Sequence, residues 1–254
     1  MPEHPRDCRI ETLAARYQLG QAAVTQLERL LDLLITDPLA PTGIRAPREV
    51  IDDHFADALV ALELDVVRDA PDLADLGSGA GIPGLPLAIA KPTAEVSLVE
   101  SNGRKCDFIR QAAQACGLHN VTVIHSRAES WSGGLGGFEL VTARALDSLA
   151  VVAEYAAPLL AVGGALVAWR GRRDGDAEAT AARAMAAVGL EPRQVRRMKP
   201  YEGAEQRHLH VSLKVMETPP GFPRRAGIAR KRPLGARVKS ESSDARGPSD
   251  RVRR

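Results

Sequence analysis

A glycine-rich segment in the first half of the chain constrains its fold more than any other feature. Residues 72–84 read Asp-Leu-Ala-Asp-Leu-Gly-Ser-Gly-Ala-Gly-Ile-Pro-Gly, so a short apolar strand runs into a turn with alternating glycines and then into a helix. Gly77, Gly79 and Gly81 let the backbone turn sharply and approach a ligand more closely than any Cβ would permit. A strand, a glycine-rich turn and a helix in this order favour an α/β domain that binds a nucleoside-containing cofactor.

The segments that follow alternate between short apolar runs and alanine-rich helical patterns. This alternation predicts βαβ units and a mostly parallel, seven-stranded sheet with helices on both faces. Aromatic residues make up only 4% of a chain that is 44% hydrophobic, a balance typical of helix-flanked sheets. We expect strands near 72–76, 95–100, 120–125, 138–143, 164–170 and 207–216, one short strand within 190–206, and helices near 84–91, 103–116, 147–161 and 176–188.

Helical segments precede this domain and a basic segment follows it. Residues 9–36 and 50–64 carry apolar side chains at helical spacing. From Arg224 to Arg254 the chain has eleven Lys/Arg and three Asp/Glu, a net charge of +8, which leaves −6 for the remainder because the whole chain carries +2. We expect an N-terminal helical extension at 1–65, a Rossmann-like domain at 66–217 and a basic tail with little order at 218–254.

Two acidic residues accompany the glycine-rich turn. Asp75 ends the strand before the turn and could accept a hydrogen bond from a cationic amino group. Glu100 ends the next strand, and its carboxylate can accept both hydroxyls of a ribose. The turn and the second acid together predict a nucleoside pocket.

The same residues also satisfy the dinucleotide-binding pattern GxGxxG, which would make the protein an NAD-binding oxidoreductase or a non-catalytic nucleotide-binding module. Asp75 would repel a pyrophosphate, Pro83 removes an amide donor near the start of the helix, and no hydride-transfer residues follow. A further alternative gives the glycines no role beyond tight packing.

Several blocks along the chain share their pattern with a known family. Within a span of about Leu27 to Leu234, the blocks are Asp75–Ile89 with Pro83 and Pro86, Leu98–Lys105, Ser126–Glu129, Ala143–Leu146, Arg207–Lys214 and Pro223–Leu234. These residues resemble the bacterial ribosomal RNA small subunit methyltransferase G family, also called glucose-inhibited division protein B. The stretch at 39–45 departs from the family pattern, whereas His54 and Asp57 match a His-x-x-Asp helix in it.

The resemblance implies a Rossmann-like, S-adenosylmethionine-dependent methyltransferase that modifies N7 of one guanosine in 16S ribosomal RNA. It implies that Gly77 and Ile82 contact the methionine side of the cofactor, that Ala128 and Glu129 lie near its adenine, and that Arg144 reaches the site from the fourth strand. The residues expected at the cofactor are Asp75, Gly77, Gly79, Gly81, Ile82, Glu100, Ala128, Glu129 and Arg144.

Methylation of guanine N7 requires no general base, because N7 carries an in-plane lone pair and loses no proton. We therefore expect no catalytic base, and positioning supplies the rate enhancement. Thr142–Leu146 stands where an amino-group methyltransferase usually has an Asn/Asp-Pro-Pro-aromatic turn, and neither Cys106 nor Cys116 is placed as a nucleophile. The alternative is a methyltransferase that acts on another RNA, a protein or a small molecule.

The basic tail is expected to bind RNA phosphates, and the partner is expected to be 16S ribosomal RNA or a small-subunit particle. Truncation after Pro220 should then weaken RNA binding and spare cofactor binding. The expected RNA contacts are Arg144, Arg207, Arg224, Arg225, Arg230, Lys231 and Arg232.

The sequence also predicts where in the cell the protein is found and whether it has a metal site. No stretch approaches the roughly 20 apolar residues that cross a bilayer, and the N-terminus is too polar for a signal peptide, so we expect a cytoplasmic protein without membrane contact. The three cysteines form no CxxC pair and have no histidine cluster nearby, so we expect no metal site. We expect a monomer.

Overall fold

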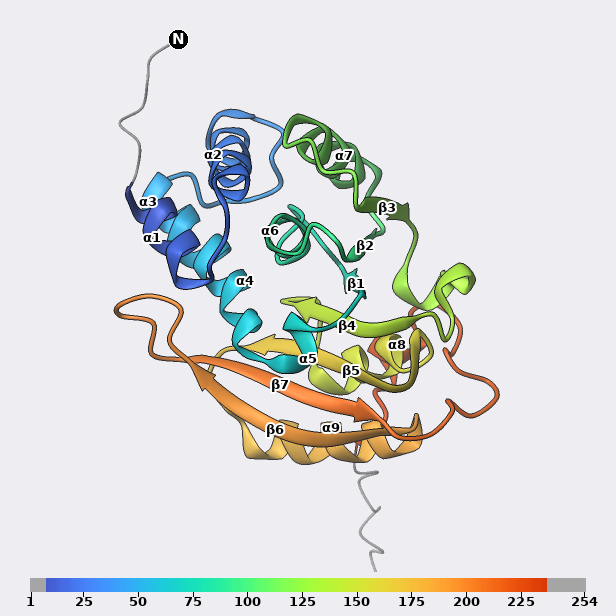
Figure 1. Cartoon of the computed structure of the whole chain (residues 1–254). Helices are drawn as coiled ribbons and strands as arrows, with labels where there is room; N and C mark the ends of the chain where they lie inside the picture. The colour runs from blue at the N-terminus through green and yellow to red at the C-terminus, as the bar shows by residue number, and fades with distance from the viewer. Residues whose placement is uncertain (1–7, 237–254) are drawn as a thin grey trace, which may run out of the picture.

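The computed structural model describes residues 8–236, and a seven-stranded sheet runs through them in the order β3-β2-β1-β4-β5-β7-β6 (Figure 1). Neighbouring strands from β3 to β5 are parallel, whereas β7 runs antiparallel to both β5 and β6. The strands are β1 (Asp72–Leu76), β2 (Glu95–Glu100), β3 (Val121–His125), β4 (Phe138–Arg144), β5 (Leu160–Arg170), β6 (Leu190–Met198) and β7 (Arg207–Lys214). The expected Rossmann-like sheet, seven-stranded and mostly parallel, is confirmed.

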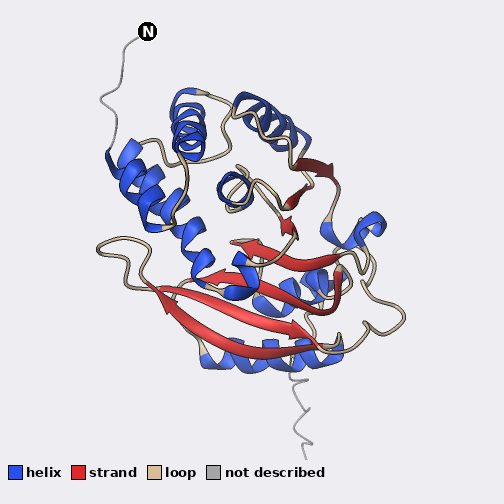
Figure 2. Ribbon diagram, in the orientation of Figure 1, coloured by secondary structure: helices blue, strands red, loops and turns tan. Residues whose placement is uncertain are grey.

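Helices cover both faces of the sheet (Figure 2). Side chains alternate along β1, so that Leu73 packs into the core on one face while Ala74 and Leu76 pack into the core on the other. The first face carries α1 (Cys8–Arg16), α2 (Gln21–Thr36), α6 (Gly84–Ala90) and α7 (Gly103–Ala115), and the second carries α8 (Leu149–Ala156), α9 (Gly175–Ala187) and the short α10 (Ile228–Lys231).

The helical stretch expected at 50–64 is helical throughout, but it is not one regular α-helix, because the type of helix changes along it. It contains α3 (Pro47–Val50), the π-helical turn η1 (Ile51–Ala56), α4 (Asp57–Leu59), the 3₁₀ turn η2 (Val60–Glu63) and α5 (Asp65–Arg68). A π-helical turn is wider than an α-helical one and is frequent at functional sites. Here the turn carries His54 and leads directly to Asp57.

Two predicted boundaries near residue 160 were wrong. The helix expected at 147–161 ends at Ala156, and the strand expected at 164–170 already begins at Leu160. Pro158 has no amide hydrogen to donate to the carbonyl of Glu154, so the helix cannot continue through it.

The short strand expected within 190–206 is the nine-residue edge strand β6. Most of its side chains are exposed, so its sequence lacks the apolar alternation of a half-buried strand. Pro192 lies at a shift of register against β7, where a missing amide hydrogen is tolerated.

The basic segment that was expected to have little order packs against the protein as far as the structure describes it. Ala229 on α10 is buried, and Phe222 and Leu234 pack against the core that contains α8. Residues 237–254 and 1–7 lie outside the described residues. Across residues 8–236, no helix has the length and apolar character to cross a membrane.

Lys214 at the end of β7 joins the ends of two helices. Its ammonium group donates to the carbonyl of Ala157 at 2.7 Å, to the carbonyl of Val188 at 3.1 Å and to the hydroxyl of Thr218. Ala157 and Val188 are the C-cap residues of α8 and α9, whose last carbonyls lack partners within their helices. Burial lowers the pKa of Lys214 from 10.5 to about 8.

We expect Lys214→Met to lower the free energy of unfolding by about 2 to 4 kcal/mol, because it leaves buried carbonyls without a donor. Urea denaturation measures this loss, and Lys199→Met, at an exposed position, is the control. Between pH 8 and 10.5 the unfolded chain binds more protons at Lys214 than the folded protein does, so wild type should gain stability over the variant as pH rises. A constant difference across this range would contradict the assignment.

Candidate functional site

The glycine-rich loop after β1 has a backbone that only glycine accommodates. Gly77, Gly79 and Gly81 have φ angles of +68°, +60° and +82°. A Cβ added to Gly77 would lie 2.5 Å from Leu146 Cδ1, and one added to Gly81 would lie 2.4 Å from Leu85 Cδ1. The loop therefore combines positive φ angles with close packing, and a side chain at Gly77 or Gly81 would displace its neighbour.

Glu100 at the end of β2 fixes this loop. Its Oε2 accepts the amide of Gly79 at 3.0 Å and its Oε1 accepts the amide of Asn102 at 2.8 Å. The side chain is buried, and Oε1 also accepts the hydroxyl of Ser101 at 3.4 Å, so Oε2 is the oxygen with a lone pair left. Glu100 thus lies beside the loop with acceptor capacity left for a ligand hydroxyl, which fits the expected contact with a ribose.

The structure does not support the expected role of Asp75. Its carboxylate is completely buried, accepting the hydroxyl of Thr142 at 2.9 Å and the amide of Gly84 at 3.3 Å. Burial raises the pKa of Asp75 to about 7. The side chain points toward the start of α6 and holds the loop through its bond with Gly84. In this position it does not reach the cavity beside the loop.

A small cavity of about 60 Å³ adjoins the glycine-rich loop. It brings together Gly77, Ala128 and Glu129, three of the residues expected at the cofactor, and adds Arg230 from the C-terminal segment. Ile82 is buried and does not line this cavity, nor does Arg144. The other lining residues are Val99, Ser101, Ser126, Arg127, Leu146 and Tyr155.

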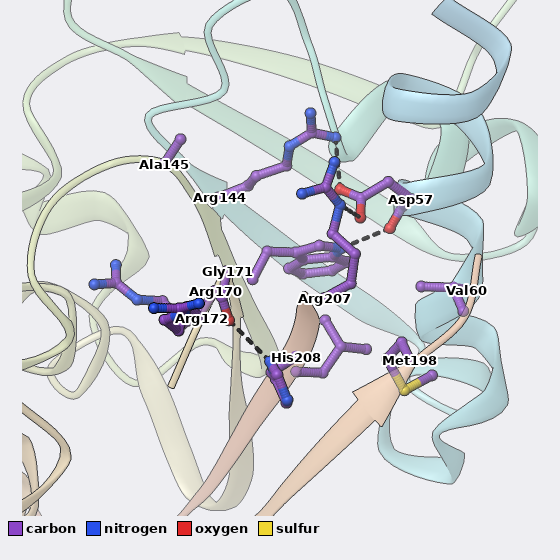
Figure 3. A pocket seen from close by; sticks show the side chains of 12 residues that line it. Asp57, Val60, Arg144, Ala145, Arg170, Gly171, Arg172, Met198, Arg207 and His208 are labelled. Carbon is purple, nitrogen blue, oxygen red and sulfur yellow. Dashed lines mark hydrogen bonds and ion pairs between the residues drawn. The ribbon is translucent and has the colours of Figure 1, made fainter. Parts of the chain in front are cut away.

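A larger cavity of about 330 Å³ lies on the other side of the end of β4 (Figure 3). Arg144 and Ala145 line this cavity, whereas the next residue, Leu146, lines the cavity beside the glycine-rich loop. Consecutive residues at the end of β4 therefore line the two cavities. The remaining lining residues are Asp57, Val60, Trp169, Arg170, Gly171, Arg172, Met198, Arg207, His208 and Leu209.

Asp57 is the one carboxylate that lines the larger cavity, and two arginines flank it (Figure 3). Arg144 Nη1 lies 3.1 Å from its Oδ2 and Arg207 Nε lies 3.3 Å from its Oδ1. Burial raises the pKa of Asp57 although both guanidinium groups oppose the shift. Asp57 Oδ1, Arg144 Nη1 and Arg207 Nε are buried and have no partner with hydrogen-bond geometry within residues 8–236. These groups retain hydrogen-bonding capacity for a ligand.

Neighbouring side chains hold the two arginines. Arg207 Nη2 donates to Asp53 at 2.7 Å, and Tyr201 donates its hydroxyl to the same carboxylate. Arg144 Nη2 lies 3.4 Å from His54 Nδ1, which must accept because a guanidinium group only donates. His54 Nε2 therefore carries the proton and donates to Thr42 Oγ1 at 2.9 Å. Burial and Arg144 lower the pKa of His54, so the ring is neutral.

Sequence reasoning missed the partners of the arginines, Asp53 and Tyr201, and left His54 without a role. The helical spacing of Asp53 and Asp57 was a usable signal, because residues four apart share one face of a helix. Nothing in the sequence indicated that Tyr201, in the loop before β7, completes the cluster.

The basic residues expected to contact RNA fall into three groups. Arg224 and Arg230 have carboxylate partners within the protein, Glu154 and Asp147. The side chains of Arg225, Lys231 and Arg232 are exposed. Arg144 and Arg207 lie in the larger cavity instead.

Among solved structures, similar folds occur in S-adenosylmethionine-binding proteins. The 16S rRNA (adenine(1408)-N(1))-methyltransferase of Catenulisporales acidiphilia with cosubstrate SAM has a TM-score of 0.50 at 17% identity, covering 61% of this chain and 90% of that one. Aeropyrum pernix fibrillarin with natively bound S-adenosyl-L-methionine has a TM-score of 0.51 at 15% identity, covering 62% and 73%. At these identities the likeness shows the fold alone.

Sequence comparison is more specific. Ribosomal RNA small subunit methyltransferase G of Chloroflexus aggregans is 41% identical over 233 residues, which cover 89% of this chain and 96% of that protein. The protein of the same name from Pelotomaculum thermopropionicum is 38% identical over 222 residues, covering 85% and 92%. A family model described as rRNA small subunit methyltransferase G matches residues 24–210, which include the glycine-rich loop, Glu100 and the Asp57 cluster. The chain therefore belongs to the rRNA small subunit methyltransferase G family.

Proposed function

We propose that the protein transfers a methyl group from S-adenosylmethionine to N7 of one guanine in 16S ribosomal RNA. The end of β4 carries this proposal, because Leu146 faces the cavity at the glycine-rich loop while Arg144 and Ala145 face the larger cavity. A methyl donor at the loop and an acceptor in the larger cavity would then meet at the end of this strand. With 16S ribosomal RNA or a small-subunit particle as partner, the protein would act in the cytoplasm, and we propose that it acts as a monomer.

The residues around the glycine-rich loop fit the methyl donor. Glu100 Oε2 has acceptor capacity left for a ribose hydroxyl, and Gly77 lines the cavity beside the loop. Ala128 and Glu129 stand where the adenine is expected. S-adenosylmethionine supplies a methyl group on a positively charged sulfur, and related proteins are named as methyltransferases.

The larger cavity suits a guanine nucleotide. Its volume falls at the lower end of the roughly 300–1,000 Å³ typical of small-ligand pockets. Guanine presents O6 as an acceptor for an arginine and an amino group at N2 as a donor for a carboxylate. Arg144 and Asp57 offer this pair of functions, and Arg170 and Arg172 line the same cavity, where they could neutralise a phosphate.

No residue has to remove a proton in this reaction. The N7 lone pair attacks the methyl carbon, the carbon–sulfur bond breaks, and its electron pair stays on sulfur. Asp57 and Arg144 then have one task, which is to hold the base in line with the methyl group. Orientation of this kind contributes on the order of 7–11 kcal/mol to the lowering of a barrier.

Nucleoside mass spectrometry of 16S ribosomal RNA from cells that lack the gene tests the proposal. We expect the loss of one 7-methylguanosine, restored by the wild-type gene. An unchanged 7-methylguanosine content would reject the assignment to 16S ribosomal RNA. Methyl transfer in vitro to naked RNA, to a partly assembled particle and to the mature subunit then identifies the substrate.

Gly77→Asp should abolish cofactor binding, because the new Cβ would meet Leu146 and the carboxylate would enter the cavity. Isothermal calorimetry with S-adenosylhomocysteine should show a loss of about 100-fold or more in affinity. Gly117→Asp is a matched control, since Gly117 has a φ of +66° and nothing lies within 4 Å of an added Cβ. If both variants bound S-adenosylhomocysteine with equal affinity, the cofactor would not bind beside Gly77.

Asp57→Asn tests the acceptor site with inosine, which lacks the amino group at N2. We expect wild type to methylate guanosine about tenfold more efficiently than inosine at the target position, and the variant to lose this preference. The measurement is kcat/KM on the two RNAs, with Asp65→Asn, an exposed partner of Arg68, as the control. A variant that keeps the preference would show that Asp57 does not read the base.

A further inference from the structure

The chain continues beyond β7 as a segment that returns to the glycine-rich loop. We call residues 219–236 the C-terminal strap; in Figure 1 it is the orange-red stretch that follows β7 and passes beside α8. Its apolar side chains Phe222 and Leu234 pack against the core that contains α8, and Ala229 is buried. The strap lies outside the part of the chain that the family model matches.

A buried ion pair fixes the strap to α8. Arg224 donates from Nε to Glu154 Oε1 at 2.7 Å and from Nη2 to Oε2 at 2.5 Å. Glu154 is only 1% exposed, so without Arg224 it would be a buried carboxylate with no partner. Arg224 also donates to the carbonyl of Arg232, which closes the strap upon itself. The strap therefore has one defined position on the protein.

In that position the strap touches the walls of the cavity beside the glycine-rich loop. The amide of Gly227 donates to Glu129 Oε1 at 3.1 Å. Arg230 lies 2.7 Å from Asp147 Oδ2 through Nε and donates to the carbonyl of Leu146 at 3.3 Å. Arg230 is itself a lining residue of the cavity, together with Gly77 just after β1 and Val99 on β2.

With the strap in this position, the cavity is a small, partly open space that does not enclose a nucleoside. Its volume of about 60 Å³ is far below the roughly 300 Å³ at which pockets for small ligands begin. Gly77 and Val99 belong to the β1–β2 end of the sheet, where the backbone is tied by the bond from the Gly77 amide to the Val99 carbonyl at 2.8 Å. Arg230 is exposed and belongs to no strand of the sheet, so it is the part of the lining that can move.

We infer that the C-terminal strap is the movable wall of the cofactor pocket and that Arg230 closes on the nucleoside of the bound cofactor. This inference rests on the cofactor site proposed above. It replaces the expectation that loss of the tail spares cofactor binding. The exposed cations Arg225, Lys231 and Arg232 lie on the same strap, so RNA phosphates bound to them hold the strap closed, and cofactor and RNA strengthen each other's binding.

Two variants of the full chain test the strap without RNA. Arg230→Met removes the exposed wall residue, and Arg224→Met releases the strap from Glu154. We expect each to weaken the affinity for S-adenosylhomocysteine about tenfold in calorimetry and to raise its dissociation rate in stopped-flow measurements. Arg193→Met, which removes an equally exposed arginine paired with Glu191 on β6, should change neither by more than about twofold.

The outcomes separate the strap from the cofactor site itself. If Arg230→Met binds like wild type while Gly77→Asp does not bind, the strap inference is overturned and the proposed site stands. If Gly77→Asp binds like wild type, the proposed site is overturned. Arg224→Met leaves the buried carboxylate of Glu154 without its partner. If this variant fails to fold for that reason, the result with Arg230→Met decides. Hydrogen exchange of the strap amides should slow when S-adenosylhomocysteine binds, and unchanged exchange would count against closure.

Discussion

The site depends on a backbone that bends where no side chain fits. Leu146 and Leu85 occupy the volumes that a Cβ on Gly77 or Gly81 would need, and a Cβ on Gly84 would lie 2.0 Å from Leu98 Cδ2. The bond from the Gly79 amide to Glu100 then holds the bend against β2. Because Leu146 follows β4, the same packing also fixes the backbone at 144–146, whose side chains line the two cavities.

The order of strands and helices around this bend was predictable, since buried parallel strands and their helices leave strong periodic patterns. The edge strand β6 was predicted to exist but not at its full length, because the side chains of an exposed strand show little apolar alternation. The internal bonds of Asp75 were not foreseen: alternation along β1 places it on the face of Leu73, toward α6, and its contact with a cofactor stays a prediction. The NAD-binding alternative was open on the glycine pattern alone, and membership of a methyltransferase family removes it.

The sequence predicted which residues gather beside the glycine-rich loop better than it predicted which residues line the larger cavity. Gly77, Ala128 and Glu129 follow strands whose carboxyl ends meet at one edge of the sheet, so their proximity follows from the fold. The larger cavity combines Asp57 from the N-terminal helical turns with Arg144 and Arg207 from two strands, and no local sequence pattern encodes such pairs. Composition likewise showed how basic the tail is, but not that Glu154 and Asp147 neutralise two of its arginines.

The C-terminal strap is tethered at both ends. Lys214 binds Thr218 just before it, and Arg183 Nε donates to the carbonyl of Gly235 at 2.8 Å near its end. When a loop anchored in this way opens, its two ends stay attached and only its middle moves away from the protein. Most of the entropic cost of bringing its ends together is already met in the folded protein. Return to the closed position is then a short local search, on the roughly nanosecond-to-microsecond timescale of loop motions. The enzyme could exchange spent cofactor for fresh without unfolding any part of its sheet.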